Sequence, residues 1–176
     1  MSTVRFISDL HFGHEFCAKL RGFDNVLEHN EYIVAAWNSV VHKRDLTFIL
    51  GDITMQTAEH YHYLNQLHGR KKVILGNHDR LQDTRELLNY VEAVGAMVKY
   101  KKCFLTHCPM HPSGLQYKVN VNIHGHSHAD IIMKEISYKG KLKDVPDERY
   151  INVCPEFINF LPQTLEQLLE KNNIKL

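Results

Sequence analysis

Five short segments carry residue types that bind metal ions, and together they fit one catalytic centre. They are Asp9-Leu10-His11, Gly51-Asp52, Gly76-Asn77-His78-Asp79, Thr106-His107 and Gly125-His126-Ser127-His128. Two metal ions held by aspartate, asparagine and histidine polarise a phosphoryl oxygen and make hydroxide from bound water at neutral pH. The segments therefore indicate metal-assisted hydrolysis of a phosphoric ester.

The donor types narrow the choice of metal. Alternate residues of an extended segment point to the same side, so Asp9 and His11 can address one ion, and His126 and His128 can share a cavity. Asp52 can bridge two ions, because a carboxylate has two oxygens. Mixed carboxylate and imidazole ligands suit zinc, manganese, iron or nickel better than magnesium or calcium. We expect two divalent ions, with manganese as the first choice.

Each of the five segments follows an apolar run that predicts a buried strand. The predicted strands cover residues 3–8, 46–50, 72–75, 97–100, 103–106, 119–124, 131–137 and 150–153. Predicted helices cover residues 27–41, 57–67 and 83–90, and a last helix starts near Pro162 with a Thr164/Gln167 capping box. The order predicts an α/β layered fold, in which catalytic loops gather at the carboxyl ends of strands.

Length and composition are ordinary for a soluble globular protein. The 176 residues with 44% hydrophobic content predict a single domain over residues 1–176. The net charge of +1 gives no strong attraction to a membrane surface or to long nucleic acid, and we expect the basic stretch 139–143 to be a solvated face. No secretion signal and no apolar run of ~20 residues is visible, and the four cysteines are widely spaced. We therefore expect reduced thiols, no membrane partner and a cytoplasmic location.

The ordered series D-x-H, G-D, G-N-H-D, H and G-H-x-H resembles the calcineurin-like metallophosphoesterase superfamily over residues 9–128. The segments Ser8-Asp9-Leu10-His11-Phe12-Gly13-His14 and Gly76-Asn77-His78-Asp79-Arg80 are most similar to the small bacterial and phage phosphoesterases. The resemblance implies one domain with a four-layer sandwich, in which two β-sheets are flanked by helices.

The resemblance also implies roles for eight residues. The first ion would be held by Asp9, His11, Asp52 and His128, and the second by Asp52, Asn77, His107 and His126. A hydroxide bridging the ions would attack phosphorus in line, and His78 would protonate the leaving oxygen or stabilise charge on the phosphoryl group. Many members carry an acid where this chain has Met55. What orients His78 is therefore open.

The leading hypothesis is a phosphodiesterase acting on a small, nucleotide-like phosphate ester. A phosphomonoesterase of the same fold and a catalytically silent, metal-bearing binding module are the alternatives, with a nuclease on long nucleic acid as a third. The sequence leaves the oligomeric state open.

Several other side chains have two interpretations each. His14 either lines the pocket or is solvated, and Arg80 either pairs with a substrate phosphate or forms a structural salt bridge. The loop 108–117, with His111 and Tyr117, is the candidate wall of the substrate pocket. We expect Cys108 to be a small buried thiol, Trp37 to anchor the core, and His124 to be a supporting or core residue. The histidines that we expect to be surface or packing residues are His29, His42, His60, His62 and His68.

Overall fold

Four parallel strands and one antiparallel edge strand form the first sheet. The computed structural model describes residues 2–116 and 118–176. The sheet has the order β11-β1-β2-β3-β4. Its strands are β1 (Val4–Ile7), β2 (Leu46–Ile49), β3 (Arg70–Ile74), β4 (Ala93–Gly95) and the antiparallel β11 (Gln163–Thr164).

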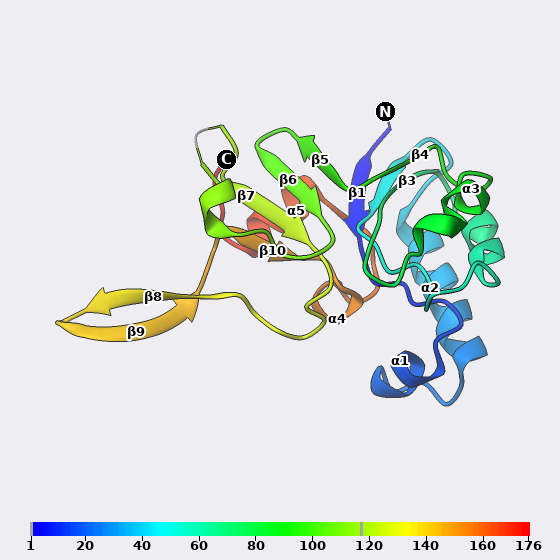
Figure 1. The fold of residues 1–176 in the computed structure, drawn as a ribbon, viewed down its shortest axis with the longest axis horizontal. Coiled ribbons are helices and arrows are strands. Elements are labelled where there is room, and N and C mark those ends of the chain that lie inside the picture. The colour runs from blue at the N-terminus through cyan, green and yellow to red at the C-terminus, as the bar shows by residue number, and fades with distance from the viewer. Residues whose placement is uncertain (1, 117) are drawn as a thin grey trace.

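A second sheet and a projecting hairpin come from the later half of the chain. The second sheet has the order β10-β7-β6-β5, with β5 antiparallel to β6 and the other pairs parallel. Its strands are β5 (Met97–Tyr100), β6 (Cys103–Thr106), β7 (Val121–His124) and β10 (Tyr150–Asn152). The strands β8 (Met133–Tyr138) and β9 (Lys141–Pro146) pair only with each other and extend away from the rest of the chain (Figure 1).

Helices flank the sheets. The α-helices are α1 (Glu15–Leu20), α2 (Val26–Val40), α3 (Thr84–Leu87), α4 (Pro155–Ile158) and α5 (Leu165–Lys171), and the 3-10 turns are η1 (Tyr61–Gln66), η2 (Leu81–Asp83) and η3 (Pro112–Gly114). The side chain of Asn25 caps α2 by accepting a hydrogen bond from the Glu28 amide. Thr164 and Gln167 form the predicted capping box at the start of α5.

Both sheets contribute to one apolar core. The ring of Phe6 lies 5.9 Å from that of Phe48 and 5.4 Å from that of Tyr100, so aromatic side chains join β1 and β2 to β5. Trp37 from α2 is fully buried in the same core, and its indole N–H donates to the carbonyl of His68. Burying one such side chain contributes roughly 1.5–3 kcal/mol. The shared core fixes the strand ends of the two sheets relative to each other.

The observed elements confirm the α/β prediction, while the four-layer arrangement stays a prediction. The expected helix over 57–67 is wrong: the structure has only the 3-10 turn η1 at Tyr61–Gln66. Before it, the Thr54 hydroxyl donates to the Thr57 carbonyl and the Thr57 hydroxyl accepts from the Glu59 amide, so these residues make local side-chain bonds that compete with a helix. The segment 83–90 is also shorter than expected, and the sequence did not predict α1, α4, β4, β9 or β11. Within the described ranges, no helix has the length and apolar composition needed to cross a membrane.

Candidate metal centre

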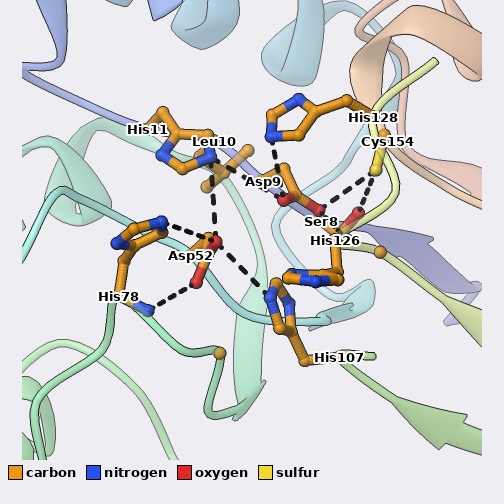
Figure 2. Close-up of polar contacts among 12 residues, drawn as sticks. Ser8, Asp9, Leu10, His11, Asp52, His78, His107, His126, His128 and Cys154 are labelled. Carbon is orange, nitrogen blue, oxygen red and sulfur yellow. Dashed lines mark hydrogen bonds and ion pairs between the residues drawn. The ribbon is translucent and has the colours of Figure 1, made fainter. Parts of the chain in front are cut away.

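The five segments that carry the candidate metal ligands lie at strand ends and converge. Three of them follow β1, β2 and β3 of the first sheet, and the other two follow β6 and β7 of the second sheet. The carboxyl ends of these parallel strands bring the side chains to one place. Figure 2 shows the histidine rings arranged around the carboxylates of Asp9 and Asp52.

Most of the proposed ligands have a left-handed backbone. The φ angle is +53° at Asp9, +51° at His11, +54° at Asp52, +67° at His126 and +43° at His128. Outside glycine, this region is uncommon, and such residues cluster at functional sites, where the surrounding structure holds the strain. The backbone therefore turns sharply at these five positions.

The first ligand group consists of Asp9, His11 and His128. The Nε2 atoms of His11 and His128 each lie 3.7 Å from Oδ1 of Asp9. Oδ1 of Asp9 and both ring nitrogens of His11 are buried without a hydrogen-bond partner in the described part of the chain. Buried polar atoms normally have hydrogen-bond partners. Carboxylate and imidazole atoms that lie close together without such partners fit a site for a bound cation.

The second ligand group consists of Asp52, Asn77 and His107. Nε2 of His107 lies 2.8 Å from Oδ1 of Asn77 and 3.4 Å from Oδ2 of Asp52. Oδ2 of Asp52 also lies 3.8 Å from Nε2 of His11, so this carboxylate stands between the two groups. Oδ2 of Asp52 therefore faces a histidine of each group.

His126 and Cys108 extend the centre on the side of His107. The ring of His126 is exposed and lies 5.1 Å from the ring of His107. Donor atoms of His107, Cys108 and His126 lie within 4.8 Å of one another. The expectation that Cys108 is a buried thiol is wrong: the side chain is exposed, because the turn after β6 directs it outward.

A network of side chains supports the first ligand group, and the sequence did not predict it. Nδ1 of His128 donates to Oε1 of Glu156 on α4 at 3.2 Å, which directs Nε2 toward Asp9. Arg21 donates to the same Glu156 oxygen and to the carbonyl of Asp9. The buried thiol of Cys154 donates to Oδ2 of Asp9 at 3.2 Å, and burial raises the pKa of this thiol, which keeps it protonated.

The network extends one step further into the protein. Nη1 of Arg21 lies 3.1 Å from Nε2 of His29, whose Nδ1 contacts Oδ1 of Asn30 at 3.3 Å. A neutral His29 satisfies both contacts, with Nδ1 as donor and Nε2 as acceptor. Burial, followed by the charge of Arg21, lowers the pKa of His29 to about 4. His29 is therefore a buried packing residue that also holds Arg21.

Backbone contacts support the second ligand group. Nδ1 of His107 donates to the carbonyl of Leu50 at 2.7 Å, which leaves Nε2 as the atom facing Asp52 and Asn77. The carboxylate of Asp79 accepts hydrogen bonds from the amides of Asp52, Ile53 and Gly76. A Cβ atom at Gly76 would lie 2.1 Å from Oδ1 of Asp52, so only glycine fits there.

The protonation states match a cation-binding centre. Burial raises the pKa of Asp9 and of Asp52, but hydrogen bonds and charge from His11 and His107 outweigh it and hold both carboxyl groups below their usual pKa range. Burial lowers the pKa of His107, and the contact with Asp52 more than reverses this. The centre thus holds two ionised carboxylates that attract positive charge.

His78 lies at the edge of the centre with its backbone fixed at both sides. Its amide donates to Oδ1 of Asp52, and its carbonyl accepts from the Gln56 amide. Nε2 lies 4.0 Å from Oδ2 of Asp52, and the side chain is 26% exposed. Met55 is an exposed side chain, and Nδ1 of His78 has no hydrogen-bond partner among residues 2–116 and 118–176. Hydrogen bonds of its own amide and carbonyl, rather than a hydrogen bond from the ring to a carboxylate, hold His78 in place.

The structure distinguishes between the two interpretations of several other residues. His14 lines a cleft beside His11, whereas Arg80 forms an exposed salt bridge with Asp83. His124 is buried and donates to the carbonyl of Gly125, as expected for a supporting residue. His111 is exposed and caps η3, and Tyr117 lies outside the described residues. That the loop 108–117 forms the pocket wall stays a prediction.

These observations define a mixed α/β protein with Asp/His groups that could hold metal ions. The chain is 30% identical to the uncharacterized protein MJ1445 of Methanocaldococcus jannaschii over 185 residues, which span 99% of this chain and 95% of MJ1445. The chain belongs to the same family as MJ1445. No established family model matches it.

One of two similar solved structures shows the same fold. The crystal structure of AQ665, a protein of unknown function from Aquifex aeolicus, is similar with a TM-score of 0.68 and 23% identity, over 97% of this chain and 99% of AQ665. An archaeal phosphodiesterase is similar with a TM-score of 0.47 and 17% identity, over 87% of this chain and 82% of that one. The second similarity is too weak to establish a shared fold.

Proposed function

We propose that this protein is a metal-dependent phosphoric ester hydrolase that acts on small, nucleotide-like phosphodiesters. The observation that carries the proposal is the position of Asp52 between the two ligand groups, with Oδ2 3.8 Å from Nε2 of His11 and 3.4 Å from Nε2 of His107. The two sheets with a shared core support the further proposal of a four-layer, calcineurin-like sandwich.

The ligand roles follow from the two groups. Asp9, His11, Asp52 and His128 would hold one divalent ion, and Asp52, Asn77, His107 and His126 would hold the other. Bound there, the ions would supply Lewis-acid polarisation of the phosphoryl oxygens and a lowered pKa of bound water. Oxygen and imidazole donors support manganese, with zinc, iron or nickel as alternatives.

The chain's own groups prepare the centre for this chemistry. The hydrogen bonds from Nδ1 of His107 to Leu50 and from Nδ1 of His128 to Glu156 leave Nε2 of each ring facing the centre, so Nε2 is the atom that would bind an ion once the ring is deprotonated. Asp52 uses Oδ1 to hold the His78 backbone, which leaves Oδ2 for the centre.

His78 is the proposed proton donor to the leaving oxygen. Its ring opens onto the cleft beside His11 and is not a member of either ligand group. An imidazole in this position can protonate the leaving group or stabilise negative charge on the phosphoryl oxygens. A cleft beside the ring leaves room for a second ester arm, which supports a diester over a monoester.

Hydrolysis of bis-p-nitrophenyl phosphate by manganese-loaded protein tests the proposal. We expect turnover, and we expect His78→Ala to lower kcat by about 10²–10⁴-fold while the metal content by elemental analysis is unchanged. His62→Ala, which removes an exposed histidine outside the centre, is the control. No turnover with manganese, zinc, iron or nickel would overturn the proposed activity, and metal loss in His78→Ala would overturn the role of His78.

A further inference from the structure

A cleft of about 460 Å³ opens beside the first ligand group and has two chemically different ends. One end is formed by the imidazoles of His11, His78 and His128. The other end carries the side chains of Phe16 and Leu20 from α1. The volume lies within the range of small-molecule sites, which typically combine apolar walls with a few polar groups.

The apolar end results from the way α1 packs. Cys17 and Ala18 are buried against the protein, whereas Phe16 is 65% exposed and Leu20 is 72% exposed. Residues four apart lie on one side of a helix, so Phe16 and Leu20 form a common face. A single exposed apolar residue is ordinary. Phe16 and Leu20 are two exposed apolar residues on one face, and they line the same cleft as His78, the proposed catalytic histidine. This arrangement indicates a binding surface.

Aromatic rings connect the two ends of the cleft. The ring of His14 lies 5.4 Å from that of His11 and 6.4 Å from that of Phe16. A planar group that extends from the metal-binding end would meet these ring faces and edges along its path. Such arrangements favour aromatic ligands beyond the gain from buried area alone.

The charges around the cleft disfavour a second phosphate. Arg21 and Glu156 both line it, and Arg21 is already bonded to Glu156, to the carbonyl of Asp9 and to His29. The side chain of Arg21 is only 2% exposed. This guanidinium is therefore not free to form the forked contact that arginine makes with phosphate.

We propose that the face formed by Phe16 and Leu20 binds an uncharged aromatic or apolar ester group of the substrate. The phosphoryl group of the same substrate lies at the end formed by His11, His78 and His128. This inference rests on the proposed function and narrows its substrate class. It places the pocket wall on α1, a helix that the sequence did not predict.

Calorimetric titration of manganese-loaded protein with phenylphosphonate and methylphosphonate tests the inference. Each compound carries one phosphoryl-like group and one arm, so the two differ only in the group that would reach α1. We expect the wild-type protein to bind phenylphosphonate about tenfold more tightly or better, from the apolar area buried. We expect Phe16→Ala and Leu20→Ala to reduce this preference while leaving the affinity for methylphosphonate unchanged.

Leu142→Ala is the matched control, because Leu142 on β9 is 71% exposed, like Leu20, and lies on the projecting hairpin. The control should keep the full preference. Equal affinities of the wild-type protein for the two phosphonates, or a preference that survives in both α1 variants, would overturn the inference alone. If the wild-type protein binds neither phosphonate and does not hydrolyse bis-p-nitrophenyl phosphate, the proposed function and the inference are both overturned.

Discussion

The two ligand groups, with Asp52 standing between them, are held in place by different kinds of contact. The first group depends on side chains from distant segments: Arg21, Glu156 and Cys154 hold Asp9 and His128. The second group depends on backbone: the Leu50 carbonyl fixes His107, and Asp79 ties together the loops after β2 and β3. The side-chain contacts of the first group can be removed with little effect on the main chain, whereas the contacts of the second group also hold the loops of the fold. The two groups should therefore respond differently to substitution.

Asp52→Asn should have the largest effect, because it removes the charge of the carboxylate that stands between the two groups. We expect hydrolysis of bis-p-nitrophenyl phosphate to fall by about a thousandfold, equivalent to about 4 kcal/mol in activation free energy. Elemental analysis should show metal loss as well. Asp144→Asn, at an exposed position on β9, is the control for the change of residue type. Retention of both activity and metal would contradict the bridging position.

Asp79→Asn tests the backbone support of the second group. The amide would replace a carboxylate that accepts from three backbone N–H groups, and hydrogen bonds to charged groups contribute about 1.5–3 kcal/mol each. We expect a loss of about 2–3 kcal/mol in the free energy of unfolding, visible by urea titration even without metal. An unchanged midpoint would show that the fold holds these loops without Asp79.

Glu156→Gln tests the side-chain support of the first group. Loss of the carboxylate partner of a metal-binding histidine typically lowers metal affinity by about 10–100-fold. We expect this weakening for one ion only, so a titration with manganese should resolve one weakened and one unchanged site. Equal weakening of both sites would mean that the two groups do not respond separately.

A smaller effect concerns the pH dependence of stability through His29. The pKa of this buried histidine is lowered to about 4 from the model-peptide value of 6.5, so the unfolded chain binds its proton more readily. The contribution of His29 to stability is therefore complete above pH 6.5 and decreases as the pH falls from 6.5 toward 4. Between pH 6.5 and 5.5 the loss should be on the order of 1 kcal/mol.

Replacing His29 by glutamine should remove that part of the pH dependence, because the amide can still donate to Asn30 and accept from Arg21 but does not titrate. The measurement is the free energy of unfolding of metal-free protein at several pH values, compared between wild type and His29→Gln. His124, whose pKa burial also lowers to about 4, is present in both proteins and cancels in the difference. Identical pH profiles would show that His29 protonates as easily in the folded state.

The features that the sequence could predict depend on local patterns, whereas those that it could not predict depend on contacts between distant residues and on turn geometry. Each candidate ligand follows a short apolar strand, and this local pattern is consistent with convergence at the strand ends. Arg21, Cys154 and Glu156 could not be found in the same way, because they reach the centre through contacts across 12 to 145 positions of the chain. The exposure of Cys108 depends on the direction of one turn, and α1 is too short to show a clear helical period. Long-range contacts and turn geometry were thus the missing information.

The left-handed backbone at five of the proposed ligands restricts how this chain can change. Besides glycine, the residues that adopt this conformation most readily are asparagine, aspartate and histidine, which are also ligand types for metals. One constraint comes from coordination and the other from main-chain geometry, and both select the same few residues. A descendant that kept the fold but lost the proposed metal site would still favour these residue types at the five positions. The same residue types at these turns in a related protein would therefore be better evidence of common ancestry than of retained activity.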